Sequence, residues 1–154
     1  MVGSACTSDA DWSTRFSTSG GVVYFRGCPV HWHTRLQRSV SHSTAEAEYI
    51  AASMAARECT FIRELLADLE RLSPGPTPML LDSKSAIDMA FDPVAFKKTK
   101  HILRDAEYLR DVVARELFRP THVPTEEQVA DIFTKALPRP TFLHLRGRLC
   151  GQTG

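Results

Sequence analysis

Paired cysteines are missing from this chain. Its four cysteines are widely separated, and none belongs to a Cys-x-x-Cys pair, which argues against a zinc ribbon. We therefore interpret them as small buried residues of a protein that works in a reducing compartment. The four are Cys6, Cys28, Cys59 and Cys150.

Long apolar runs and net charge are also missing. No apolar run approaches the roughly 20 residues that a membrane-spanning helix needs, and residues 1–30 lack the pattern of a secretory signal. The formal net charge is +1, so a surface that binds nucleic acid must come from local clusters of basic residues. With 154 residues, of which 43% are hydrophobic and 24% charged, the sequence is typical of one soluble domain. We expect this domain at residues 1–150, with a tail at 151–154.

Strands and helices follow one another in an order that indicates an α/β fold. Short runs rich in β-branched and aromatic residues predict strands, and turn residues between the first three, among them residues 17–21, favour antiparallel pairing. The expected strands lie at residues 2–7, 22–25, 30–33, 78–81 and 117–123. The expected helices lie at residues 43–72, 83–91, 99–116 and 138–149, with a further helix that begins at residue 125. This order predicts a helical layer on a mixed sheet.

The first long helix marks its own beginning. The segment Ser43-Thr44-Ala45-Glu46 fits a capping box, with Ser43 as the N-cap and Glu46 reaching back to the amide of Ser43. Apolar residues at helical spacing predict the buried face of this helix and of the helix at residues 99–116. The first set is Ile62, Leu65, Leu66 and Leu69, and the second is Ile102, Leu109, Val112 and Val113.

Four acidic residues stand out because each lies in a short motif of its own. Asp9 closes or lies within the first strand, and Asp82 ends a later strand directly before a helix. The carboxyl ends of parallel strands meet at one edge of a sheet, so neighbouring strands would bring both carboxylates into one crevice. Glu48 and Asp131 would then enter from the early turns of two helices.

Such a cluster would repel itself, and at least one carboxyl pKa should rise unless cations compensate the charge. Two hard cations roughly 3.5–4 Å apart would offset the repulsion and activate a water, the usual arrangement for cutting a phosphodiester. Taken alone, Asp82 is also a candidate N-cap, and Asp9 a turn residue. Glu48 alone also fits a helix surface, and Asp131 a first-turn charge that favours the helix dipole. The joint pattern favours a metal-dependent nuclease.

The residues around these acids carry a resemblance to a known family. The matching segments are Ser-Asp-Ala-Asp-Trp (8–12), Ser-Thr-Ser-Gly (17–20), Gly-Cys-Pro-Val-His-Trp (27–32), Ser-Thr-Ala-Glu-Ala-Glu-Tyr-Ile-Ala (43–51), Thr-Lys-His-Ile (99–102) and Val-Pro-Thr-Glu-Glu-Gln-Val-Ala-Asp-Ile-Phe-Thr-Lys (123–135). In this order, across nearly the whole chain, they resemble the ribonuclease H domain at the C-terminal end of copia-type LTR-retrotransposon polyproteins, the C-terminal part of a reverse transcriptase.

The resemblance implies a ribonuclease H fold, a five-stranded mixed sheet of order 3-2-1-4-5 flanked by helices. It also implies endonucleolytic cleavage of the RNA strand of RNA–DNA hybrids. The family's acidic tetrad falls on Asp9, Glu48, Asp82 and Asp131. Asp11 and Glu46 lie in the same motifs outside the tetrad, and we interpret Asp11 as an Asx-turn residue. Because the domain follows a polymerase in this family, that domain of the same polyprotein is an expected partner.

The expected cofactors are two Mg²⁺ ions, with Mn²⁺ as a substitute. Asp9 and Asp131 would hold the first ion, and Asp9 would share the second with Glu48 and Asp82. We expect a monomer without membrane contact, in the cytoplasm and in the virus-like particle of the element.

Substrate binding is expected to be mainly electrostatic. The segment 97–104 is basic and contains no acid, and basic residues also follow Asp131. Solvated helix faces, and turn or cap duties for the serines, are the alternatives. The expected nucleic-acid-binding residues are Ser17, Ser43, Lys97, Lys98, Lys100, His101, Arg104 and Lys135. For Trp12 and Trp32 we favour core packing over stacking on bases.

Two other functions stay open. The first is a ribonuclease H-like module that binds hybrid with weak or no cleavage, and the complete tetrad argues against it. The second is an integrase or transposase core, which uses three acids with Glu last, whereas this chain has Asp last. The chain also departs from the family, which usually has an Asp at the position of Leu103. Cellular relatives carry a His in a flexible loop before the last acid, where it helps product release, and this chain has no room for such a loop before Asp131. A structural role is the favoured interpretation of both His101 and His122. His101 or His122 would substitute only loosely, which puts turnover rather than reaction class in question.

Overall fold

The strands of the protein form one mixed sheet with the order β3-β2-β1-β4-β5. The computed structural model describes residues 3–13, 15–91 and 103–151. The strands are β1 (Ser4–Asp11), β2 (Thr18–Phe25), β3 (Cys28–Leu36), β4 (Thr77–Leu81) and β5 (Phe118–His122). β2 is antiparallel to β1 and β3, whereas β4 is parallel to β1 and β5. The predicted fold class and strand order are therefore confirmed.

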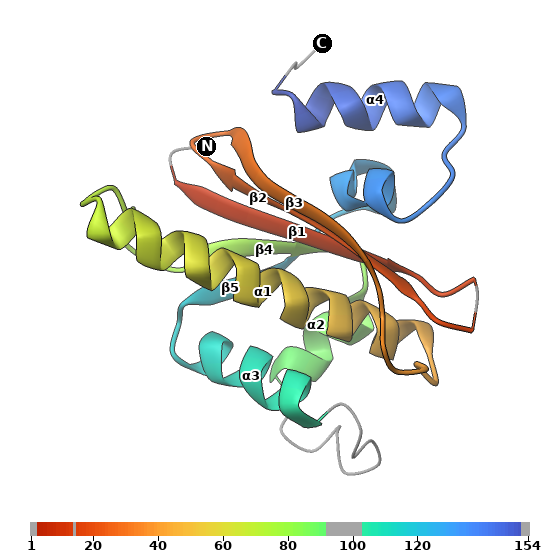
Figure 1. Ribbon diagram of the computed structural model, residues 1–154, viewed down its shortest axis with the longest axis horizontal. Helices are drawn as coiled ribbons and strands as arrows, with labels where there is room; N and C mark the ends of the chain where they lie inside the picture. Colours follow the sequence, from red (N-terminus) through yellow and green to blue (C-terminus); the bar gives the residue numbers. More distant parts are fainter. Residues whose placement is uncertain (1–2, 14, 92–102, 152–154) are drawn as a thin grey trace.

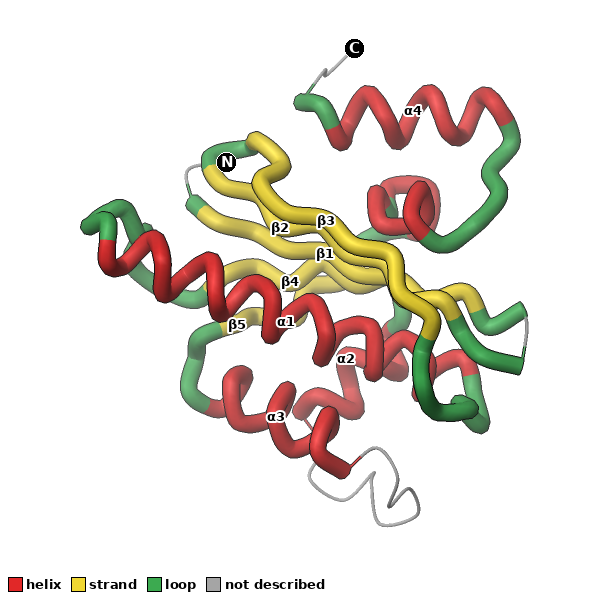
Figure 2. The backbone as a smooth tube through the Cα atoms, in the orientation of Figure 1, coloured by secondary structure: helices red, strands yellow, loops and turns green. Residues whose placement is uncertain are grey.

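Helices cover the sheet on both sides. On one side lie α1 (Thr44–Asp68), α2 (Lys84–Phe91) and α3 (Leu103–Ala114), and on the other lie η3 (Val129–Phe133) and α4 (Arg139–Leu149) (Figure 1). Figure 2 shows η3 as a single short coil between the sheet and α4. It is a 3-10 helix, as is η2 (Thr125–Glu127), so the helix expected to begin at residue 125 is replaced by two short turns. No helix in the described ranges is long and apolar enough to span a bilayer.

α1 begins at its predicted cap. The Ser43 hydroxyl accepts a hydrogen bond from the Glu46 N–H at 3.1 Å. The Glu46 carboxylate accepts one from the His42 N–H at 2.9 Å, at the residue before the N-cap. Together these bonds satisfy two amides at the entry to the helix, which is the physical purpose of a capping box.

The core lies between α1 and the sheet. Alanines on the buried side of α1 present little bulk, so the helix backbone can come close to β1 and β2. The largest core side chains are Tyr49, Met79, Leu81, Leu109 and Phe118. Leu65 and Leu69 are exposed, contrary to prediction, because the buried position goes to Leu66 and Leu69 follows the end of the helix. Successive helical residues point about 100° apart, and in α1 the direction of Leu66 faces the core while that of Leu65 faces away from it.

The turn expected at residues 17–21 is wrong. Thr18 begins β2, and Gly20 and Gly21 pair within the sheet with Asp9 and Ser8. A Cβ on Gly20 would lie 2.7 Å from both the Phe133 Cβ and the Thr134 Cγ2. Because Gly20 has no side chain, it allows β2 to come close to the end of η3, and it does not lie in a turn.

Two further predictions about burial fail in part. Cys6 and Cys59 are buried as expected, but Cys28 and Cys150 are exposed. Trp12 and Trp32 are also exposed, so core packing is wrong for both. Trp32 lies on the edge strand β3, where alternate side chains face away from α1. The Trp12 indole donates a hydrogen bond to the Ser41 carbonyl at 3.1 Å.

Gly20→Ala should test the close approach of η3 to the sheet. The new methyl group meets backbone-proximal atoms on two sides, so we expect about 1–3 kcal/mol lower unfolding free energy in urea. Gly21→Ala is the matched control, because its Cβ would meet the tip of the His33 ring, which can turn aside. A smaller loss for Gly20→Ala than for Gly21→Ala would contradict this account.

Candidate metal centre

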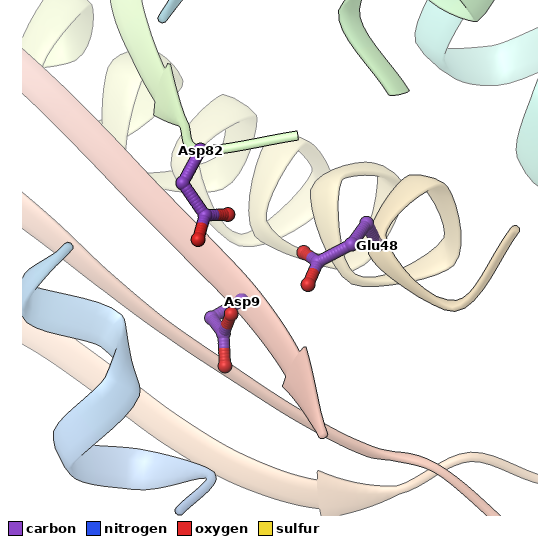
Figure 3. A group of neighbouring side chains, drawn as sticks. All are labelled: Asp9, Glu48 and Asp82. Atoms are coloured by element: carbon purple, nitrogen blue, oxygen red, sulfur yellow. The ribbon is translucent and has the colours of Figure 1, made fainter. Parts of the chain in front are cut away.

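Three carboxylates from separate elements converge at one end of the sheet. Asp9 comes from β1, Glu48 from the second turn of α1, and Asp82 directly follows β4 (Figure 3). Each offers an oxygen such that all three lie within 4.8 Å of one another. The parallel pairing of β1 with β4 sets Asp9 and Asp82 side by side, and the packing of α1 on β1 brings Glu48 over them. The strand-end argument from sequence thus holds for this pair.

Burial and like charge act together in this cluster. Asp9 is 0% exposed, Glu48 is 5% exposed, and Asp82 is half-buried. Burial, and then the negative charges of Asp9 and Asp82, raise the pKa of Glu48 to about 9. A hydrogen bond with the backbone of Ala10 opposes the shift without cancelling it. The cluster therefore favours any cation that offsets its charge.

Asp131 reaches this site through a lysine. Its carboxylate on η3 is buried, and its Oδ1 accepts a hydrogen bond from the Lys135 ammonium at 2.9 Å. The same ammonium donates to Asp9 Oδ1 at 3.1 Å. Burial and the charge of Asp9 raise the pKa of Asp131 to about 6, although Lys135 opposes the shift. Among the described residues, the group of three converging carboxylates does not include Asp131. Asp131 is instead linked to Asp9 by the Lys135 ammonium, which pairs with both.

Both oxygens of Asp9 accept hydrogen bonds from the turn that follows η3. The Thr134 hydroxyl donates to Oδ2, and the Lys135 ammonium donates to Oδ1. Burial lowers the pKa of Lys135, but the two carboxylates outweigh it and the net shift is upward. Lys135 thus stays charged and holds Asp9 in one orientation. Sequence analysis assigned Lys135 to nucleic-acid binding, and its pairing with the carboxylates was not foreseen.

Gln128 attaches η3 to β1 and was missed from sequence. It is fully buried, and its side-chain amide donates to the Ser8 carbonyl at 3.0 Å. Its Oε1 accepts hydrogen bonds from the Thr7 hydroxyl and from the Ala130 N–H, the latter at 3.3 Å. Since Asp9 follows Ser8 directly, these bonds fix Asp131 relative to Asp9. The signal was a glutamine in the motif around Asp131, but the motif does not reveal its partners.

The other predicted residues fall in different surroundings. Ser43 is exposed and serves as the N-cap of α1, whereas Ser17 is buried. Arg104 lies in the first turn of α3, but the structure does not describe the position of its side chain. Lys97, Lys98, Lys100 and His101 lie outside the described residues. The nucleic-acid contacts of this set therefore stay predictions.

Asp11 and His122 lie near members of the tetrad but outside the group of converging carboxylates. Asp11 accepts hydrogen bonds from the Ser13 N–H at 3.0 Å and the Ser13 hydroxyl at 2.7 Å, as expected of an Asx turn. His122 is exposed at the end of β5, where its backbone pairs with Leu81, the residue before Asp82.

The donor set fits a hard divalent cation. Asp9, Glu48 and Asp82 offer oxygen atoms alone, which Mg²⁺ and Mn²⁺ prefer to nitrogen or sulfur. The upward pKa of Glu48 indicates negative charge that the neighbouring protein groups leave uncompensated.

The chain is similar in sequence to polyproteins of plant transposons. It is 32% identical over 146 residues to the "Retrovirus-related Pol polyprotein from transposon RE1" of Arabidopsis thaliana, covering 92% of this chain and 10% of the polyprotein. It is 34% identical over 132 residues to the polyprotein of transposon TNT 1-94 from Nicotiana tabacum, covering 86% of this chain and 10% of the polyprotein. The chain is therefore similar to a segment of transposon Pol polyproteins. It spans about a tenth of the length of those relatives, and no family model matches it.

Solved structures show that this chain has the ribonuclease H fold. LC11-RNase H1, isolated from compost by a metagenomic approach, superposes with a TM-score of 0.66 at 16% identity, covering 87% of this chain and 94% of that one. The same enzyme in complex with an RNA/DNA hybrid gives 0.61 at 14% identity, covering 85% and 93%. The N-terminal RNase H domain of rv2228c from Mycobacterium tuberculosis gives 0.60 at 15% identity, covering 87% and 91%.

Gln128→Ala should loosen η3 from β1. The change leaves a cavity and unpaired polar groups on β1, so we expect about 2–4 kcal/mol lower stability. Hydrogen exchange followed by mass spectrometry should show faster exchange in η3 and the turn after it than in β5. Equal protection of η3 in the variant and the wild type would contradict the docking role of Gln128.

The raised pKa of Glu48 predicts that the free energy of unfolding depends on pH when a chelator keeps divalent ions out of the site. Its pKa rises from 4.5 to about 9 on folding, so its contribution to stability is present below 4.5 and is lost as pH rises through 9. Asp131, whose pKa rises from 3.8 to about 6, loses its contribution earlier. Between pH 7 and 9 in EDTA, stability should fall by at most about 1.4 kcal/mol per pH unit because of Glu48.

Glu48→Gln should flatten this slope, as measured by urea unfolding at pH 7, 8 and 9. Glu64→Gln, on an exposed position of the same helix, is the control and should keep the wild-type slope. Parallel curves for wild type and Glu48→Gln would rule out the cluster as the cause.

Proposed function

We propose that this chain is a metal-dependent endoribonuclease that cleaves the RNA strand of RNA–DNA hybrids within a retrotransposon reverse transcriptase. The observation that carries the proposal is the convergence of Asp9, Glu48 and Asp82 at the end of β1 and β4. Three buried or half-buried carboxylates, with oxygens within 4.8 Å of one another, destabilise a fold unless a cation offsets their charge. The homology to Pol polyproteins and the hybrid bound by LC11-RNase H1 support the substrate class.

The residues for cation binding divide into two groups. Asp9, Glu48 and Asp82 would hold one divalent ion, and Asp9 with Asp131 would hold the other. Bound Mg²⁺ or Mn²⁺ supplies a water of lowered pKa and charge that stabilises the phosphoryl group and the leaving oxygen. The proposed product ends are a 5′-phosphate and a 3′-hydroxyl.

The protein's own groups orient this site. The Thr134 hydroxyl and the Lys135 ammonium both donate hydrogen bonds to Asp9, so its carboxylate is oriented before a divalent ion binds. Glu48 projects from a helix that is anchored at its cap, on the side of the site opposite η3. From there its carboxyl group could contact the 2′-hydroxyl that distinguishes RNA from DNA. Such fixed geometry is what positioning of a scissile phosphate requires.

The surroundings of the site suit a hybrid held mainly through its backbone. Trp12 lies half-exposed just beyond the end of β1, three residues after Asp9, and could stack on a sugar or base. We propose the polymerase domain of the same polyprotein as a partner, since the relatives are ten times longer than the segment they share with this chain. That neighbour would add further surface for binding the hybrid.

A cleavage assay tests the proposal. Labelled RNA–DNA hybrid, RNA duplex and DNA duplex are each incubated with Mg²⁺, Mn²⁺ or EDTA, and cleavage of the RNA strand of the hybrid is expected with either ion alone. Asp9→Asn and Asp82→Asn should lower the rate by about a hundredfold or more, which corresponds to about 3 kcal/mol of barrier.

Asp111→Asn is the matched control, because it removes an exposed acid on α3 that pairs with Arg115. It should cleave at the wild-type rate. Hybrid binding without cleavage, together with no Mg²⁺-dependent rise in melting temperature, would favour the inactive binding module instead.

A further inference from the structure

Lys135 lies between two buried carboxylates rather than on the protein surface. Its ammonium is 3.1 Å from Asp9 Oδ1 and 2.9 Å from Asp131 Oδ1. The side chains of Asp9 and Asp131 are 0% and 8% exposed, whereas that of Lys135 is 33% exposed. The lysine therefore reaches from the edge of the site into the position that both acids share.

The local backbone holds Lys135 in this place. The N–H groups of Thr134 and Lys135 both donate to the Asp131 carbonyl, at 3.2 and 3.0 Å, and close a tight turn after η3. The Thr134 hydroxyl bonds to Asp9, and Gly20 leaves room for the turn against β2. The pairing is thus a built feature of the fold rather than a chance surface contact.

The charges of the site are compensated on one half and not on the other. Lys135 neutralises part of the charge of Asp9 and Asp131. Among the described residues, no basic side chain forms an ion pair with Glu48 or Asp82. The half formed by Asp9, Glu48 and Asp82 is open to a divalent ion, while the Asp9–Asp131 half already contains a cation.

We propose that Lys135 is an internal competitor for the second divalent ion. Its ammonium holds the position between Asp9 and Asp131 and must move out before an ion binds there. Ions then bind in order: the first at Asp9, Glu48 and Asp82, and the second only at higher concentration. The proposal rests on the function proposed above and adds a regulation of the same site by divalent-ion concentration.

The chemistry of lysine suits such a displaceable cation. An ammonium is a compact charge on a flexible four-carbon stem, so it can leave the carboxylates by rotating its side chain. Its partial exposure provides a path to solvent without movement of η3. Once displaced, the ammonium lies at the edge of the site, where it could meet the phosphates of a hybrid. Lys135 is a positioning residue in this scheme, because it acts through Asp9 and Asp131.

Counting bound Mn²⁺ by electron paramagnetic resonance, without nucleic acid, tests the order of binding. The variants are Lys135→Met, which keeps the length of the stem, and Lys135→Ala. In both, the second step should tighten by about tenfold or more, because the ammonium has left the position between Asp9 and Asp131. The first step should tighten less, because Asp9 alone of its three carboxylates contacts Lys135. Arg115→Ala is the control: it removes one exposed positive charge far from the site and should keep both steps unchanged.

A second measurement uses the wild-type protein and needs no variant. Acetylation of lysines by acetic anhydride is followed by peptide mapping with and without Mn²⁺. Lys135 should be modified several times faster when Mn²⁺ saturates the second step, while the exposed Lys84 keeps its rate. This readout holds even if the Lys135 variants fail to fold.

The outcomes separate this proposal from the nuclease proposal. An unchanged second step in both variants, or equal acetylation of Lys135 with and without Mn²⁺, would overturn displacement. A single bound Mn²⁺ in wild type and in both variants would also overturn it, because removal of the ammonium would then have opened no second position. Absence of hybrid cleavage with a tightened second step would remove the nuclease proposal and leave the competitor role of Lys135 standing.

Discussion

Repulsion among buried carboxylates is the constraint on which this structure depends. Asp9 carries no exposed surface, and Glu48 and Asp131 carry very little. In water their charges would separate, but the fold holds them on elements that cannot move independently. The upward pKa shifts of Glu48 and Asp131, caused first by burial and then by Asp9, are the cost of this arrangement.

The fold meets that constraint through its interior contacts. β1 lies at the centre of the sheet and carries Asp9, so both neighbouring strands and α1 restrain it. Gln128 and Thr134 fasten the segment around η3 to the same strand, and Gly20 opens the space that this segment occupies. Residues outside the acidic tetrad thus decide whether the acids meet. Stability and chemistry share the same hydrogen bonds at this end of the molecule.

Because Lys135 pairs with Asp9 and Asp131, the tetrad consists of two unequal halves rather than four equivalent acids. A tethered ammonium in one half makes binding of a second divalent ion conditional on its displacement. The arrangement also links the site to its substrate, since a displaced lysine lies beside the acids. The other tetrad residues, Glu48 and Asp82, have no comparable internal cation in the described ranges.

Local patterns in the sequence predicted much of the fold. The N-cap at Ser43, the amphipathic spacing of Leu109, Val112 and Val113, and the strand leading to Asp82 were all correct because each depends on neighbours along the chain. The errors arose where contacts between segments distant in sequence determine the structure. Gly20 was taken for a turn residue because its partner, Thr134, is remote in sequence. Leu65 and Trp32 were placed in the core because apolarity alone does not reveal which side of an element is covered.

The same division applies to the site. Sequence alone determined which residues carry the carboxyl groups and in which order the elements follow, because residue type and short-range periodicity are properties of the chain itself. Only the tertiary structure decided that Asp9, Glu48 and Asp82 gather directly while Asp131 meets Asp9 through Lys135. Ångström-scale distances between charges depend on how strands and helices pack, and that packing is the sum of contacts spread over the whole chain.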